Sequence, residues 1–463
     1  MSRPLEEIAA ATPAAPLSLK RRALTASGWS AAGFAASQGI RLLTTLVMTR
    51  FLAPDMFGVM AIAVMVNVIT SLLTDLGVKQ NIIQSHRGED PVFLDTAWTV
   101  QIVRGGIVWG LALLVALALV VAGALGLLPA GTVYAAPILS AVLAVSSFSV
   151  VISGFQSTRA AMAERSLNQR TLIQIELACQ VAALLFMVSV GAATHSIWAL
   201  VGGQLVASVV GVSLTHAILP GHPNRFAWDR GALAEIIGFG KWIFVSSFIG
   251  VFALNADRIV LGGVFTPSLL GQFAIATALA GAVQGVFAKL YSTILMPVLS
   301  ETARLQRWRL KEVFYRMRVP TDLALLFCAG LLASSGSLIV RLLYDRRYGD
   351  AGWMLEILAF SLVWARYGAT QELYLALGKP RYVAFLNFAR FGSVFAALFL
   401  GLALGGAKGA IWGFALHQVA IAAITYRFNA ILGLNDFARD LGVLVALPIG
   451  YAAGEALQWL LRR

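Results

Sequence analysis

The sequence predicts an all-α polytopic membrane protein with about 13 transmembrane helices. Three observations predict this fold. Hydrophobic residues make up 59% of the 463 residues and charged residues only 12%, a composition unlike that of a soluble globular chain. The apolar residues gather in runs of about 20 residues or more, the length that spans a bilayer as a helix. The two halves of the chain also share sequence at a nearly constant offset, which indicates a duplicated bundle.

Thirteen apolar runs are expected to form the spanning helices. They cover residues 26–50, 56–79, 94–126, 132–156, 171–191, 195–219, 237–263, 269–298, 319–342, 351–377, 382–404, 409–431 and 440–461. The first run follows a basic cluster at 20–22 and has no small-residue cleavage pattern. We therefore expect it to stay in the protein as a helix rather than to be removed as a signal peptide.

An internal repeat divides the chain into two lobes. Residues 54–63 (PDMFGVMAIA) align with 267–276 (PSLLGQFAIA), and the Ile, Trp and Gln within 197–204 recur within 411–418. Six runs in each half give both halves the same orientation, so their pseudo-symmetry axis should lie along the membrane normal. The predicted organisation is a cytoplasmic tail (1–22), an N-terminal six-helix lobe (23–219), a cytoplasmic linker (220–236), a C-terminal six-helix lobe (237–432) and one additional C-terminal helix (433–463).

The distribution of basic residues predicts the orientation. With the N-terminus placed inside, Lys and Arg outside the runs are far more numerous in the inner segments than in the outer ones, as the positive-inside rule requires. Arg462 and Arg463 do not fit, because an odd number of helices leaves them outside. The side of the C-terminus therefore stays open.

Six cations lie inside the apolar runs, where a central charge costs roughly 2.5–3.5 kcal/mol on insertion scales. They are Arg41, Arg104, Arg258, Lys289, Arg366 and Arg390. Such residues need a wet or anionic environment, which predicts a positively charged cavity between the lobes. Because guanidinium groups bind phosphate oxygens bidentately, the expected cargo is anionic, and a diphosphate suits the cavity best.

Four of these cations are the predicted binding residues of the cavity: Arg41, Arg104, Arg258 and Lys289. Each has a structural alternative, which for Arg41 is an ion pair with Asp75. Arg366 and Arg390 lie nearer the inner face, and we expect them to extend toward the lipid headgroups.

Three carboxylates are candidates for binding a coupling ion: Asp75, Asp257 and Glu176. Asp75 is the leading one, because it ends a polar stripe on the second run that also contains Asn67, Thr70, Ser71 and Thr74 at helical spacing. Burial raises the pKa of a carboxyl group while a nearby Arg lowers it, so this position could carry a protonatable switch.

Several other classes of function are disfavoured. The net charge of +13 comes from basic residues that flank apolar runs, which is typical of topology signals and lipid headgroup contacts rather than of nucleic-acid binding. Cys179 and Cys328 lack metal or redox spacing, and we expect neither a metal nor a cofactor. A membrane polymerase or glycosyltransferase would need a sizeable outer loop with catalytic carboxylates or arginines, which this chain lacks, so an enzyme is not expected.

Four stretches resemble the Wzx-type flippases of lipid-linked oligosaccharides, in the multidrug/oligosaccharidyl-lipid/polysaccharide exporter superfamily. They are TRFLAPDMFGVMAIA (49–63), LTDLGVKQNIIQ (73–84), DTAWTVQIVRGG (95–106) and YLALGKPRY (374–382). The resemblance implies two six-helix bundles and an alternating-access cycle. It implies a cargo of polyprenyl-diphosphate-linked oligosaccharide repeat units for O-antigen, capsule or exopolysaccharide, with the diphosphate and sugar in a basic central cavity.

We expect residence in the bacterial inner membrane, among membrane lipids, with the N-terminus in the cytoplasm as the basic residues indicate. The resemblance leaves the coupling ion open between proton and sodium, and it allows contact with the polysaccharide polymerase machinery. A small-solute or drug exporter of the same superfamily is the alternative. The excess of cations in the spans disfavours a carrier of cationic drugs, which would need carboxylates.

Overall fold

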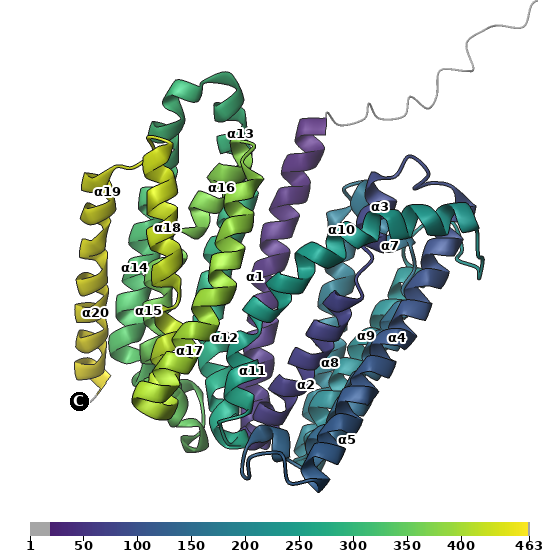
Figure 1. Ribbon diagram of the computed structural model, residues 1–463, viewed down its shortest axis with the longest axis horizontal. Helices are drawn as coiled ribbons and strands as arrows, with labels where there is room; N and C mark the ends of the chain where they lie inside the picture. The colour runs from purple at the N-terminus through teal and green to yellow at the C-terminus, as the bar shows by residue number, and fades with distance from the viewer. Residues whose placement is uncertain (1–18, 462–463) are drawn as a thin grey trace, which may run out of the picture.

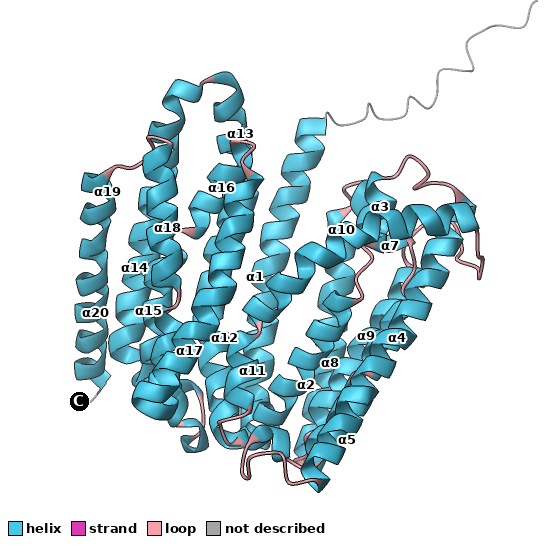
Figure 2. Ribbon diagram, in the orientation of Figure 1, coloured by secondary structure: helices cyan, strands magenta, loops and turns pink. Residues whose placement is uncertain are grey.

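The computed structural model describes residues 19–461, with side chains from residue 28 onward except at 239–249. Most of the predicted tail, residues 1–18, lies outside the described part, as do Arg462 and Arg463. Within the described range the chain is helices joined by loops and turns, and Figure 2 shows no strand there. The predicted all-α class is confirmed.

The N-terminal lobe contains nine α-helices and one short 3-10 turn. They are α1 (Leu19–Phe51), α2 (Pro54–Leu73), α3 (Val78–Gln84), α4 (Pro91–Ala124), η1 (Val133–Ala135), α5 (Ile138–Ser146), α6 (Phe148–Gly154), α7 (Arg159–Arg165), α8 (Gln169–Thr194) and α9 (Trp198–Ala217).

The remaining helices form the C-terminal lobe and the segment that follows it. They are α10 (Arg230–Leu254), α11 (Ala256–Gly262), α12 (Pro267–Leu290), the π-helical turn η2 (Tyr291–Leu295), α13 (Met296–Leu305), η3 (Arg307–Arg309), α14 (Leu310–Leu343), η4 (Arg346–Tyr348), α15 (Asp350–Ala365), α16 (Gly368–Ala376), α17 (Pro380–Leu416), α18 (Gln418–Ile431), α19 (Phe437–Gly442), η5 (Val443–Val445) and α20 (Ala446–Leu461).

The internal repeat corresponds to a contact between the two lobes. Pro54 and Pro267 each begin a helix, α2 and α12, where a proline is well tolerated because the first turn needs no backbone donor. A Cβ atom added at Gly58 would overlap the carbonyl oxygen of Pro267, and one added at Gly271 would overlap that of Pro54. The two helices therefore meet through repeat-related residues at one end of the molecule. Figure 1 shows the lobes diverging from this end toward the end where α1 begins.

Eight helices in the described range are long and apolar enough to cross a membrane, and nine if the pair Ile138–Gly154 and Arg159–Arg165, bent by 66°, counts as one broken span. The predicted number of 13 is not confirmed. Two of the predicted runs fall short for physical reasons: α1 carries several cations, and α15 has only 16 residues.

One of the eight, the 52-residue stretch Pro380–Ile431, is a helical hairpin. Gly405 and Gly406 have non-helical backbone angles, and Gly406 has φ of 58°, a conformation that glycine adopts readily. Beyond them the chain returns along itself, because a Cβ at Gly409 would overlap the Gly401 carbonyl and one at Gly413 would overlap that of Ala397. The stretch therefore contains two antiparallel helices, as the separate runs 382–404 and 409–431 predict.

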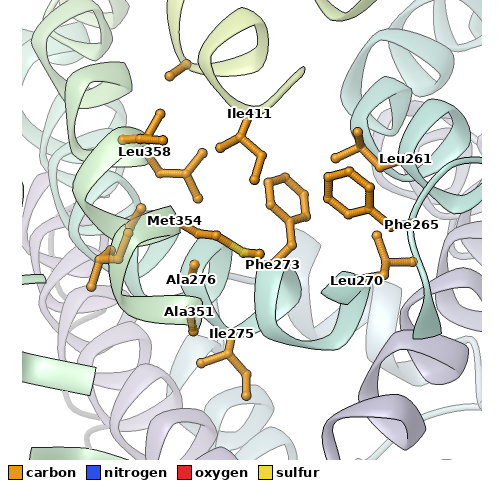
Figure 3. Packing of buried hydrophobic residues seen from close by; sticks show 14 of the residues in the cluster. Leu261, Phe265, Leu270, Phe273, Ile275, Ala276, Ala351, Met354, Leu358 and Ile411 are labelled. Carbon is orange, nitrogen blue, oxygen red and sulfur yellow. The ribbon is translucent and has the colours of Figure 1, made fainter. Parts of the chain in front are cut away.

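The largest hydrophobic cluster joins the two lobes beside the contact of α2 with α12 (Figure 3). Phe273 of α12 packs edge-on against Phe265, with ring centroids 6.3 Å apart, and against Phe414 at 5.9 Å. Ile62 of α2 belongs to the same cluster and is fully buried. Burying such side chains contributes about 1.5–3 kcal/mol each, so this end of the molecule is held by apolar packing as well as by close helix approach.

The segment between the lobes is fastened to the N-terminal lobe. Asp95 near the start of α4 contacts His222 Nε2 at 3.0 Å and accepts a hydrogen bond from the backbone N–H of Arg225 at 2.9 Å. Asp229 then caps α10 by accepting from the N–H of Ala232 at 2.7 Å. The second part of the predicted linker 220–236 is thus helical, and Ala232 packs with the N-terminal lobe's core.

Candidate functional site between the two lobes

The candidate site begins with the polar face of α1, which lies between the lobes. Phe34 lies four residues after Ser30, and Ser37 and Gln38 lie three and four residues after Phe34. This spacing places all four residues on one face of the helix. The Ser37 hydroxyl donates to Glu176 of α8 at 3.2 Å. A Cβ on Gly285 of α12 would come within 3.2 Å of the Phe34 ring and 3.8 Å of the Gln38 amide nitrogen. This face of α1 is therefore directed toward α8 of one lobe and α12 of the other.

Arg41 lies on this same face, four residues after Ser37 and three after Gln38. Arg41 is exposed. Its guanidinium makes no hydrogen bond or ion pair with residues whose side chains are described. Asp75, the partner considered from the sequence, contacts Arg104 instead. The structure thus places a free guanidinium on the helix face that both lobes approach.

Lys289 lies near the end of α12 and faces α1. Its ammonium donates to the Ser30 hydroxyl at 2.9 Å. Lys289 and Arg41 therefore belong to the same interlobe surface, Lys289 beside the first half of α1 and Arg41 on its second half. Glu176 on α8 borders this surface and also accepts from Gln180 at 3.2 Å.

Arg104 on α4 points into the N-terminal lobe. Its guanidinium donates to the backbone carbonyls of Thr74 at 2.9 Å and Ser71 at 2.7 Å, and lies 3.8 Å from the Asp75 carboxylate. It therefore binds the carbonyl end of α2, where a cation is favoured. Arg104 also lines a cavity of about 230 Å³ together with Lys79 and Gln101. The structure does not bring it into contact with the other three predicted cations.

The polar stripe of the second run is partly interrupted. α2 ends at Leu73, so Asp75 lies beyond the helix rather than on it, which corrects the predicted run 56–79. The Asp75 carboxylate accepts from the N–H of Gly77 at 3.0 Å, and Gly77, with φ of 59°, is the residue just before α3. Asn67, higher on the stripe, donates to Ser146 of α5 at 3.3 Å. These polar groups serve packing inside the N-terminal lobe.

Asp257 and Arg258 lie at the start of α11, near the contact of α2 with α12. Asp257 is 4% exposed, and Arg258 is partly exposed. The Asp257 carboxylate interacts with the charge and the backbone N–H of Arg258. As consecutive helical residues they point in different directions.

Arg366 does not extend toward the lipid headgroups, which corrects the expectation for this residue. It is 5% exposed, and it donates to the Asp440 backbone carbonyl and to the Tyr367 hydroxyl, each at 3.3 Å. The neighbouring tyrosine ring and carbonyl provide a buried polar partner, so the side chain has no need to reach water. Arg390 instead lines a small cavity of about 60 Å³ with Gln284 and Gln418.

Sequence analysis missed one buried charge cluster. Arg318 and Asp322 are 1% and 2% exposed, and Arg318 also contacts Asp440. The predicted run 319–342 left Arg318 in a loop, whereas α14 begins at Leu310 and continues through Pro320. The spacing of Arg318 and Asp322, four residues apart, was the signal that could have identified the cluster. Among residues 19–461 no group of three or more His, Cys, Asp or Glu could hold a metal ion.

A profile of a family described as polysaccharide biosynthesis protein matches residues 47–353, more than half of the chain. The chain belongs to the polysaccharide biosynthesis protein family. No match was found among curated proteins. The family membership confirms the resemblance drawn from stretches 49–63, 73–84 and 95–106.

Solved structures show which fold this member of the polysaccharide biosynthesis protein family has. It is similar to a protein named as lipid II flippase MurJ in an inward closed conformation, with a TM-score of 0.68, 11% identity, and coverage of 92% of this chain and 91% of that one. It is also similar to an inward-facing multidrug resistance MATE transporter of the MOP superfamily (TM-score 0.63, 12% identity, coverage 89% and 97%). A eukaryotic MATE transporter, AtDTX14, gives a TM-score of 0.56 at 13% identity (coverage 92% and 99%). The chain therefore has the fold of MOP-superfamily flippases and exporters, which are not enzymes, and is a multi-pass membrane protein.

Proposed function

We propose that this protein is a flippase that translocates polyprenyl-diphosphate-linked oligosaccharide repeat units across the bacterial inner membrane, for O-antigen, capsule or exopolysaccharide synthesis. Its membership in the polysaccharide biosynthesis protein family and its fold, shared with a protein named as a lipid II flippase, support this proposal. The proposal includes contact with the polysaccharide polymerase machinery.

The observation that carries the proposal is the position of Arg41. It is a free guanidinium on the α1 face that lies between α8 and α12. A guanidinium in such a place costs free energy unless water or an anion solvates it. A diphosphate offers oxygens that a guanidinium binds bidentately. Lys289, on the facing helix and bound to Ser30, adds a second cation to the same interlobe surface. Arg104 and Arg258 are proposed as further contacts of the cargo during the transport cycle.

The lobe arrangement provides the route for transport. The lobes touch at the ends of α2 and α12 and diverge toward the end where α1 begins (Figure 1). In the proposed cycle the diphosphate-sugar head enters from the divergent end, the lobes rock about the contact of Gly58 with Pro267, and the head leaves on the other side. The polyprenyl tail stays in the lipid.

The charge distribution supports an orientation with the divergent end in the cytoplasm. Basic residues lie where α3 joins α4, α7 joins α8, α9 joins α10, α13 joins α14 and α16 joins α17. Figure 1 shows these junctions at the divergent end, and the positive-inside rule expects such residues in cytoplasmic segments. These residues include Arg87, Arg165, Arg225, Arg307, Arg309 and Lys379. We therefore place the N-terminus in the cytoplasm.

Coupling to a proton or sodium ion is proposed at Asp75, Asp257 or Glu176. A driving ion must bind the two states of the transporter with different affinity. Asp75 contacts Arg104 and the end of α2, so a change in its charge would alter how α4 holds α2. If Asp75→Asn leaves both the transport rate and its pH dependence unchanged, Asp75 is not the coupling residue.

The test is translocation in proteoliposomes that contain a fluorescent polyprenyl-diphosphate oligosaccharide and a membrane-impermeant reporter of its side. Flipping that depends on the protein supports the proposal. The rival function is export of small solutes or drugs, which the shared fold with MATE transporters favours. Absence of flipping with several sugar compositions, together with protein-dependent efflux of a small solute from the same vesicles, would replace the flippase proposal with that one.

A further inference from the structure

A buried charge cluster lies in the C-terminal lobe, away from the interlobe face. Arg318 of α14 contacts Asp322 through Nε at 3.1 Å and Asp440 through an Nη atom, also at 3.1 Å. The rings of Phe314, Tyr315 and Tyr367 surround its guanidinium at 5.2–5.7 Å. Asp440 belongs to α19, the start of the C-terminal segment that packs along α14 through α20.

The charges of the cluster balance only when both carboxylates are ionised. Two cations, Arg318 and Arg366, face two anions, Asp322 and Asp440; Arg366 reaches the cluster through the Asp440 backbone carbonyl at 3.3 Å. Three tyrosine hydroxyls also interact with the cluster: Tyr291 of η2 with Asp322, Tyr315 of α14 with Asp440, and Tyr374 of α16 with Arg318. Removing charged groups from water is expensive unless their hydrogen bonds are complete.

The two carboxylates are unequally supported. One oxygen of Asp440 accepts from the Tyr315 hydroxyl at 2.9 Å, and the other contacts Arg318. Asp322 has only the Arg318 contact, and its Oδ1 is buried without a hydrogen bond. The guanidinium nitrogens of Arg318 also lack hydrogen-bond geometry although they lie at ion-pair distances. Buried polar groups in native structures rarely lack a hydrogen bond, and those that do often have a functional role.

The pair of Arg318 and Asp322 encloses Pro320, which lies inside α14. Proline has no backbone N–H, so the carbonyl of Arg316, four residues earlier, has no backbone partner in the helix. Prolines are among the common causes of helix kinks. At this point α14 is braced by a side-chain ion pair that spans the proline rather than by a continuous hydrogen-bond ladder.

From these contacts we infer that Asp322 is a proton-binding site of the C-terminal lobe, and that its protonation releases the Arg318 brace so that α14 bends at Pro320. A neutral Asp322 no longer forms an ion pair with Arg318, which is then paired with Asp440 alone. Because α14 packs on both α15 and α20, a bend would move the lobe's outer helices together. The inference rests on the proposed function only in assigning this motion to the transport cycle, and it adds a site to the three proposed coupling carboxylates.

The proton site itself is tested by infrared difference spectroscopy on the full-length protein in nanodiscs. Lowering the pH is expected to produce a carbonyl band of a protonated carboxylic acid that is lost in Asp322→Asn and retained in Asp345→Asn, a partly exposed carboxylate outside the cluster. Survival of the whole band in Asp322→Asn would overturn the assignment.

The bend is tested by the distance between spin labels at Glu312 and Leu342 near the two ends of α14, after Cys179 and Cys328, both free thiols, are replaced. We expect this distance to shorten in the wild type as the pH falls, to stay short at every pH in Asp322→Asn, and to stay long at every pH in Pro320→Ala. A wild-type distance that does not change with pH, or an Asp322→Asn variant that responds like the wild type, would overturn the inference. These readouts need no cargo. A wild type that fails to flip the lipid yet shows the pH-dependent bend would contradict the flippase proposal and leave the proton site standing.

Discussion

Gly58 and Gly271 occupy equivalent positions in the two lobes, and each lies against the proline that begins the other's helix. A Cβ on either glycine would overlap a proline carbonyl of the opposite helix. This reciprocal contact follows from the internal repeat, because the residues that make it in one lobe have counterparts in the other. It joins the lobes at the end of the molecule opposite the start of α1, and in the proposed cycle it is the point about which they rock.

Replacing Gly58 or Gly271 with Ala should weaken this contact. Overpacking of a closely packed site typically costs about 1–3 kcal/mol, and neither proline carbonyl can move without moving its helix. Thermal unfolding of the detergent-solubilised variants measures the effect. Gly281→Ala, on the same α12, is the matched control, since a Cβ there meets nothing within 4 Å and Ala favours a helix by up to about 1 kcal/mol over Gly. Equal melting temperatures for Gly58→Ala and Gly281→Ala would contradict the close crossing.

Arg104→Ala should destabilise the N-terminal lobe by about 1–3 kcal/mol, because two carbonyls at the end of α2 lose their donors. Arg104→Lys should recover part of this loss, since an ammonium cannot reproduce both guanidinium contacts. Hydrogen exchange in α2 locates the effect: faster exchange is expected in its last turn, around Ser71. Unchanged exchange there in Arg104→Ala would show that Arg104 does not hold the helix end.

The first turn of α4 should lose protection at acidic pH. The Arg87 guanidinium, hydrogen-bonded to Asp90, and the N–H of Val92 hold the pKa of this carboxyl below its ordinary value. A lowered folded-state pKa stabilises the turn above the ordinary Asp pKa of about 4, and this contribution is lost as the pH falls through the folded-state value. Hydrogen exchange near Val92 at decreasing pH measures it. In Asp90→Asn the acid-dependent change should disappear, and its persistence would assign the change to another group.

Sequence patterns predicted the all-α fold, the repeat and the family because these depend on local periodicity and composition. The same patterns could not show where helices end or which side chains meet. α2 stops at Leu73 and the chain passes through residues 74–77 into α3, a break that hydropathy does not detect. Arg366 is buried beside Tyr367 rather than at the lipid surface because α19 folds back over it. Arg318 lies outside the predicted run because the apolar stretch begins at 319, whereas α14 begins at Leu310.

For the candidate site, the sequence singled out cations within apolar runs but could not show their partners. Arg104 and Lys289 both have hydrogen-bond partners, Arg104 inside one lobe and Lys289 across to α1. These partners lie far away in the sequence, so only the three-dimensional arrangement separates a helix-capping arginine from a free one. The contacts of Ser37 and Gln38 show which way this face of α1 points. They therefore identify Arg41, on the same face, as a cation directed between the lobes.

The most direct test of the account compares flipping of the fluorescent polyprenyl-diphosphate oligosaccharide by wild-type protein, Arg41→Ala and Arg41→Lys in matched proteoliposomes. Charge should matter more than bulk, so Arg41→Lys should keep partial activity and Arg41→Ala little. Arg381→Ala, an exposed cation at the start of α17, should flip at the wild-type rate. Wild-type flipping by correctly inserted Arg41→Ala would contradict the claim that a free guanidinium between the lobes carries the diphosphate.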